Sequence, residues 1–284
     1  LSIMPKQHPA WSWNSKSSDK KTFSSTSLFG SISRQDAFEG SLGSGIKIAV
    51  VDSGVDNNHP AVDGSVKGWA EPILEEGGGI TFRNNPHNDL FGHGTACAGI
   101  IHNIAPDAEI YSVRVLGSRL SGKGAIFAAG LKWAIDNRMD VVNLSLGTSN
   151  KEYFSRFHEL VDEAYYRNVI LVTAANNMPV ISFPSLYSTV ISTACYEDAK
   201  ESSQLDYYYN PEPPVEFGAH GTDKEVAWLD GRYVRATGNS FTAPTMTGIV
   251  ALLLSKHPNL TPFEVKSVLS SLASNNLTNT EYTI

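Results

Sequence analysis

Three residues that together could break an acyl bond stand far apart in the chain. Asp52 ends an apolar run, His93 has a glycine on each side, and Ser240 precedes a long apolar stretch. A serine becomes a nucleophile when a histidine takes its proton, and a carboxylate must hold that histidine in the right tautomer. Each residue alone has an ordinary structural explanation, such as a turn or a helix cap. Their combination predicts acyl transfer, with Ser240 as nucleophile, His93 as base and Asp52 as its orienting carboxylate.

The order of these residues along the chain narrows the class of enzyme. Aspartate comes first, histidine second and serine last, whereas two other hydrolase classes have the orders His-Asp-Ser and Ser-Asp-His. Ser240 also lacks the flanking Gly-x-Ser-x-Gly pattern of the nucleophile elbow. The order therefore disfavours a generic lipase or esterase.

The elements that must position these residues alternate between strands and helices. Runs rich in β-branched residues predict strands over 46–51, 110–115, 141–146, 169–173 and 190–193. Apolar spacing and a capping box at Thr261 predict helices over 127–135, 152–167 and 261–272. This alternation predicts an α/β fold with three α/β/α layers and a mostly parallel sheet. Asp52 and Asn177 both follow predicted strands, where the functional residues of such sheets gather.

Two segments depart from this alternation. Residues 1–28 are polar and rich in Ser and Lys, which predicts an N-terminal arm ahead of one domain over 29–284. Residues 197–226 contain three consecutive tyrosines, three prolines and several carboxylates. We expect this second segment to be a long surface excursion.

The segments around the three residues resemble the motifs of the subtilase family. Residues 49–56 (AVVDSGVD) resemble its Asp motif, 93–99 (HGTACAG) its His motif and 238–248 (GNSFTAPTMTG) its Ser motif. The segments between them match as well, and the similarity runs from about Ile32 to Leu272. The resemblance implies a subtilisin-like serine peptidase that cleaves peptide bonds through an acyl-enzyme.

The same resemblance implies roles for further residues. Asn177 matches the oxyanion-hole asparagine, which would act with the backbone N–H of Ser240. An extended protein or peptide substrate would lie along Ser145-Leu146-Gly147 and a second edge, Leu120-Ser121-Gly122, by strand addition. Asn176, where the family usually has glycine, would line the pocket for the side chain before the scissile bond.

The resemblance implies no cofactor. The connection over 100–104 is too short for the loop that holds a tight Ca²⁺ in secreted subtilisins. Asp56-Asn57-Asn58 and residues 84–89 are rich in oxygen ligands, a pattern more often found in turns. Weak calcium binding at these two runs is the alternative.

Composition excludes several other classes of partner. The 284 residues carry a net charge of −7 and no basic run of the kind that binds nucleic acid. No apolar stretch reaches the roughly 20 residues of a membrane span, and the first residues do not form a signal peptide. Two cysteines, Cys97 and Cys195, favour reduced thiols and an intracellular origin.

Two alternative functions stay open from the sequence. A maturation enzyme of this family could pass the acyl group to an amine and close a ring, if residues 68–91 or 197–226 shielded the acyl-enzyme from water. An inactive relative could use the same groove only to bind peptides. The intact triad favours catalysis over the second alternative.

Overall fold

The computed structural model describes residues 32–199, 203–212 and 214–276 of the chain. The predicted N-terminal arm, residues 1–28, lies outside this part. The domain boundary at residue 29 therefore stays a prediction.

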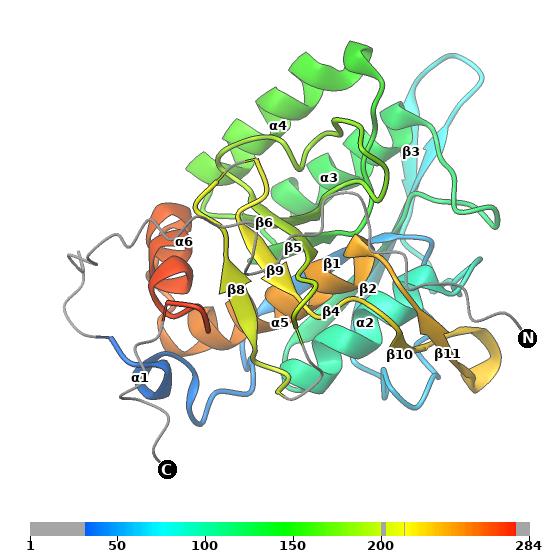
Figure 1. Cartoon of the computed structure of the whole chain (residues 1–284). Coiled ribbons are helices and arrows are strands. Elements are labelled where there is room, and N and C mark those ends of the chain that lie inside the picture. Colours follow the sequence, from blue (N-terminus) through cyan, green and yellow to red (C-terminus); the bar gives the residue numbers. More distant parts are fainter. Residues whose placement is uncertain (1–31, 200–202, 213, 277–284) are drawn as a thin grey trace, which may run out of the picture.

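A nine-stranded sheet crosses the molecule in the order β3-β2-β4-β1-β5-β6-β7-β9-β8 (Figure 1). Its strands are β1 (Lys47–Asp52), β2 (Val66–Leu74), β3 (Ile80–Arg83), β4 (Glu109–Arg114), β5 (Val141–Leu144), β6 (Ile170–Ala174), β7 (Ile191–Cys195), β8 (Tyr207–Tyr209) and β9 (Phe217–Ala219). Neighbours pair in parallel except β2–β3 and β8–β9, the two edge pairs. The predicted mostly parallel sheet is confirmed, and each predicted strand is present.

Helices cover both faces of this sheet. They are α1 (Arg34–Phe38), α2 (His93–Ile104), α3 (Gly124–Asp136), α4 (Phe154–Tyr166), α5 (Thr242–Lys256) and α6 (Pro262–Ser271). In strand β1, Ile48 and Val50 belong to one core with α2 and α5, while Ala49 and Val51 belong to a second core with α3 and α4. The continuous apolar run of β1 is explained by burial on both faces. The predicted three-layer α/β/α architecture is confirmed.

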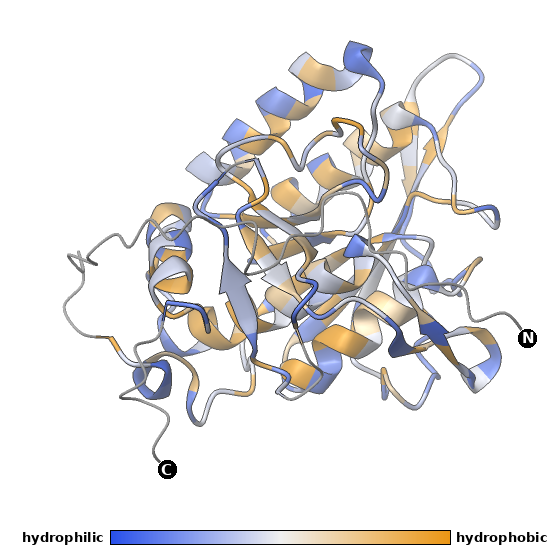
Figure 2. Ribbon diagram, in the orientation of Figure 1, coloured by the Kyte–Doolittle hydropathy of each residue, from blue (hydrophilic) through white to orange (hydrophobic). Residues whose placement is uncertain are grey.

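The two sides of the sheet differ in how deeply their helices are buried. Every residue of α5 from Thr242 to Leu254 is buried, whereas α4 buries only one side. Figure 2 shows this contrast as a mainly orange α5 and a blue outer side on α4. Helix α6 begins with the predicted capping box between Thr261 and Glu264. Since α5 begins two residues after Ser240, this buried helix anchors the predicted nucleophile.

The expectation of a surface excursion over 197–226 is wrong. Strands β8 and β9 in this segment extend the sheet beyond β7, and Tyr207 and Phe217 are fully buried. Local composition suggested a loop, but pairing between β7, β8 and β9 joins residues that are distant in sequence. Of the tyrosine run only Tyr207 is fully buried, whereas Tyr208 and Tyr209 are half-buried.

One hairpin forms an edge of the nine-stranded sheet, and a second forms a separate two-stranded sheet. Strands β2 and β3 form the first, and residues 75–83, which include its tip, are all exposed. Strands β10 (Lys224–Ala227) and β11 (Tyr233–Ala236) form the second, beside α2 (Figure 1). Among the described helices, none combines the length and apolar character needed to cross a bilayer.

Candidate active site

Asp52 and His93 form a buried pair at the carboxyl end of the central strand. Asp52 is the last residue of β1 and His93 the first of α2, and the two side chains are almost inaccessible to solvent. Both oxygens of the Asp52 carboxylate lie 2.9 Å from His93 Nδ1. A carboxylate only accepts hydrogen bonds, so Nδ1 carries the proton and Nε2 keeps a free electron pair. This is the tautomer that a general base needs.

The pKa of His93 reflects two opposed effects. Burial lowers the pKa of His93, because it disfavours the charged ring. The charge of Asp52, its hydrogen bond and the charge of Asp89 outweigh burial, so that the pKa of His93 is raised above its usual 6.5. The site therefore stabilises the imidazolium that forms when this ring accepts a proton.

Ser240 lies in the 3-10 turn η3 (Asn239–Phe241), directly before α5. Ser145 Oγ donates a 2.8 Å hydrogen bond to the Ser240 carbonyl, and Cys97 Sγ lies 3.8 Å from the same oxygen. The sulfur is also 4.0 Å from Asp52 Oδ2, so Cys97 connects both halves of the site. No hydrogen bond joins the Ser240 hydroxyl to His93 within the described residues; such contacts commonly tighten only when substrate binds.

Asn177 is held beside Ser240 by Asn239, the residue directly before Ser240. The backbone N–H of Asn239 donates to Asn177 Oδ1 at 2.9 Å, so this bond uses the amide oxygen of Asn177 and not its NH₂ group. The buried Asn239 side chain itself bonds Cys195 N and the carbonyls of Ala175 and Asn176. Asn239 therefore ties the ends of β6 and β7 to the Ser240 turn, a role that its sequence position did not reveal.

The two predicted substrate edges follow β4 and β5, the strands on either side of β1. Leu146 is half-buried and Gly147 exposed, and neither makes a backbone hydrogen bond in the described structure. Ser145 is buried and points to Ser240 instead. On the other edge, Leu120 to Gly122 lie in a turn in which Gly117 N donates a 3.0 Å hydrogen bond to Ser121 O. Free backbone groups therefore line at least the Leu146-Gly147 edge.

Asp89 is a site residue that the sequence interpretation assigned to an ordinary turn. Its carboxylate is 6% exposed and accepts from the Ser53 and Thr95 hydroxyls and from three backbone N–H groups. In the other oxygen-rich run, Asp56 accepts from Asn58 N. Both oxygens of Asp89 thus accept hydrogen bonds from protein donors.

Gly92, the residue before His93, sits under an aromatic ring. Its φ of +111° is one that side chains rarely adopt, and a Cβ here would lie 2.6 Å from the Trp228 indole. Trp228 also contacts the Phe91 ring edge to face, with centroids 5.5 Å apart. The Trp228 indole therefore fixes the turn that enters α2.

The two cysteines are free, as predicted, and both are buried. Burial raises the pKa of the Cys97 thiol well above its usual value, with a further contribution from Asp52. Cys97 therefore stays protonated. It contributes packing and weak hydrogen bonds beneath His93.

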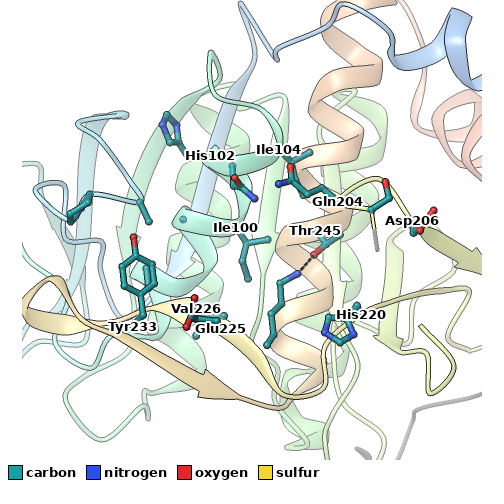
Figure 3. Close-up of a pocket in the computed structure, with 17 residues that line it drawn as sticks. Ile100, His102, Ile104, Gln204, Asp206, His220, Glu225, Val226, Tyr233 and Thr245 are labelled. Atoms are coloured by element: carbon teal, nitrogen blue, oxygen red, sulfur yellow. Dashed lines mark hydrogen bonds between the residues drawn. The ribbon is translucent and has the colours of Figure 1, made fainter. Parts of the chain in front are cut away.

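A pocket of ≈ 640 Å³ lies away from these residues, between the last turns of α2 and the β10–β11 hairpin (Figure 3). Ile100, His102 and Tyr233 line it, and Lys224 reaches across to Thr245. None of the triad residues contributes to this pocket. We assign it no part in the chemistry of Ser240.

Comparison with known proteins gives consistent matches. A family model described as "Subtilase family" matches residues 43–283. Subtilisin E of Bacillus subtilis (strain 168) is 32% identical over 250 residues, which cover 83% of this chain and 62% of the relative. Subtilisin of Bacillus pumilus is 31% identical, with 83% and 86% covered. The chain thus spans less than two thirds of the length of Subtilisin E.

Solved structures agree with these matches. A cold-adapted subtilisin-like serine proteinase superposes with a TM-score of 0.65 at 25% identity, covering 86% of this chain and 88% of that one. The S41 psychrophilic protease gives a TM-score of 0.69 at 26% identity, with 81% and 84% covered.

Proposed function

Because this chain belongs to the subtilase family, we propose that it is a serine endopeptidase with Asp52, His93 and Ser240 as its triad. The observation that carries the proposal is the buried Asp52 carboxylate, whose two oxygens both lie 2.9 Å from His93 Nδ1. A structural histidine rarely needs a buried charge. A general base does, because that charge stabilises the ring when it becomes cationic.

The proposed reaction has two half-reactions. Ser240 Oγ attacks the scissile carbonyl carbon while its proton passes to His93 Nε2. The tetrahedral intermediate collapses as His93 returns the proton to the leaving amine, which leaves an acyl-enzyme. A water then attacks the ester with His93 again as base, and the acid product and free Ser240 are released.

Asn177 and the Ser240 backbone N–H would stabilise the oxyanion in both half-reactions. Support comes from the bond between Asn239 N and Asn177 Oδ1, which leaves the NH₂ as the free donor of that amide. Donors held in place before the charge develops need no reorganisation during the reaction.

The substrate would be a protein or peptide in extended conformation. The exposed backbone of Gly147 and the half-buried Leu146 offer hydrogen-bonding groups for strand addition. This edge continues from β5, next to the strand that carries Asp52, and would place the scissile bond near the triad.

Labelling with a fluorophosphonate probe and digestion of a defined peptide test this proposal. The wild type should be labelled and should give products heavier in total by one water. Ser240→Ala should lose both activities, while Ser149→Ala, at an exposed serine, should keep them. Residual labelling of Ser240→Ala would place the nucleophile elsewhere. A wild type without labelling would indicate a peptide-binding domain, and a cyclic product without added water would indicate acyl transfer to an amine.

A further inference from the structure

A second buried carboxylate stands behind the Asp52–His93 pair. Asp89 lies in the loop between β3 and α2 and is 6% exposed. Its Oδ1 accepts from Ser53 Oγ, Phe91 N and Gly92 N at 2.7–2.9 Å. Its Oδ2 accepts from Thr95 N and Thr95 Oγ1 at 2.8 and 2.7 Å. A carboxylate with this many donors is held in a single orientation.

These donors belong to the start of the helix that carries His93. Helix α2 begins after Gly92, which has no side chain and provides no cap. Asp89 Oδ2 accepts a hydrogen bond from the N–H of Thr95, the third residue of the helix, as an N-cap side chain would. Ser53 Oγ takes the N–H of Gly94 at 3.1 Å. Asp89 and Ser53 thus replace the missing cap and fix the backbone on both sides of His93.

The Ser53 hydroxyl lies between the two carboxylates. Its oxygen is 2.7 Å from Asp89 Oδ1 and 3.2 Å from Asp52 Oδ1. A hydroxyl has one proton to donate, and the shorter contact indicates that Asp89 receives it. Asp52 Oδ1 then keeps only the Ser53 backbone N–H, at 2.8 Å, and His93 as close donors.

We propose that Asp89 is a positioning residue for the reaction of the triad: by capping α2 and holding the Ser53 hydroxyl, it leaves the Asp52 carboxylate directed at His93. The inference rests on the proposed function of the triad. The hydrogen bonds of Asp89 go to neither His93 nor Ser240, so Asp89 acts through Ser53 and the helix start.

The charges around His93 determine the sign of the effect. Asp52 from β1, Asp89 from the loop and the neutral Cys97 from α2 are the titratable groups facing the ring, and His87 with Arg114 lies beyond Asp89. Two anions favour the protonated ring. Removal of the Asp89 charge should lower the pKa of His93, and a freed Ser53 hydroxyl that turned to Asp52 would lower it further.

The test is the NMR titration of the His93 ring, assigned by its loss in His93→Gln. We expect Asp89→Asn to lower the pKa of His93 by about one unit, with the acid limb of kcat/KM moving down equally. Asp63→Asn, at an exposed position with φ of +48° that Asn tolerates, removes one carboxylate elsewhere and should leave the titration unchanged. Asp89→Glu keeps the charge and should stay near the wild type.

Ser53→Ala keeps the inference testable if Asp89→Asn fails to fold. Because the hydroxyl proton is assigned to Asp89, its removal should move the His93 titration by less than about 0.3 units. A rise of about one unit in Ser53→Ala would show that the hydroxyl donates to Asp52 and would overturn the assignment. A lower melting temperature in Asp89→Asn with unchanged His93 titration would also overturn it. The titration needs no turnover, so failure of the proposed peptidase activity is recognised separately by absent probe labelling.

Discussion

Gly92→Ala should disturb both stability and activity, since Gly92 combines an unusual backbone conformation with a ring above it. For a residue with a side chain, a left-handed backbone conformation costs about 1–2 kcal/mol, and we take the same cost for the φ of +111° at Gly92. The new Cβ would also lie 2.6 Å from Trp228, and such overpacking costs about 1–3 kcal/mol. We expect the free energy of unfolding to fall by about 3.5 kcal/mol, the middle of the summed range.

The measurement is urea unfolding, with Gly64→Ala as the matched control. Gly64 also has positive φ, +70°, but a Cβ there would contact nothing within 4 Å. Gly64→Ala should therefore lose only the backbone cost of about 1–2 kcal/mol. Since His93 follows Gly92 directly, kcat/KM should drop at least about tenfold in Gly92→Ala and stay near the wild type in the control.

A double-mutant cycle tests the steric part of this reasoning. Trp228→Ala removes the ring that the new methyl group would strike, so the two changes should couple favourably by about 1–3 kcal/mol. If Gly92→Ala loses no more stability than Gly64→Ala, or if Trp228→Ala brings no relief, the contact with the ring does not constrain this turn.

Three further predictions follow from the site and its surroundings. Asn177→Ala should lower kcat by roughly 10²–10³ with little change in KM, the loss known for the side-chain donor of subtilisin. Asn176→Gly should instead change which side chains are accepted before the scissile bond. Kinetics on two peptides that differ at that position test both variants, and an exchange of the two effects would show that the assignment is off by one. Burial and the charge of Arg114 lower the pKa of His87 to about 4. As pH falls from 6.5 towards 4, His87 becomes protonated in the unfolded chain but not in the folded protein, so stability should fall. In thermal melts the melting temperature of His87→Gln should fall less over this range than that of the wild type, and equal falls would contradict the prediction. The prediction of a short connection over 100–104 is wrong, because these residues complete helix α2 and the connection to β4 is residues 105–108. Since this connection is still short, EDTA should leave the melting temperature unchanged, and a drop reversed by calcium would reveal a bound ion.

The layers and the proximity of Asp52 and His93 could be predicted because both depend on patterns that are visible in the sequence alone. Strand β1 reads as a β-branched run since both its faces are buried, and Asp52 follows directly at its end. The residues that support the triad could not be found in this way. Asp89 looks like part of a polar turn until the fold brings Ser53 and Thr95 to it.

The same limit explains the wrong expectation for residues 197–226. Prolines and carboxylates are typical of loops, and nothing local shows that Tyr207 will be buried. Its burial depends on β9 pairing with β7 and on β8 pairing with β9. Asn239 was missed for a related reason, because its amide satisfies groups at the ends of two other strands.

The exposed β2–β3 hairpin has a consequence for the proposed peptidase at high concentration. Its tip carries three glycines, Gly77 to Gly79, where a Cβ would meet no neighbour within 4 Å. Exposed loop tips are preferred sites of nicking, so other copies of the enzyme would encounter this one as a substrate. A cut there would place Asp52 and His93 on separate fragments. Because β4 pairs with both β1 and β2, the fragments would stay associated, and self-digestion would first yield a nicked, two-chain enzyme.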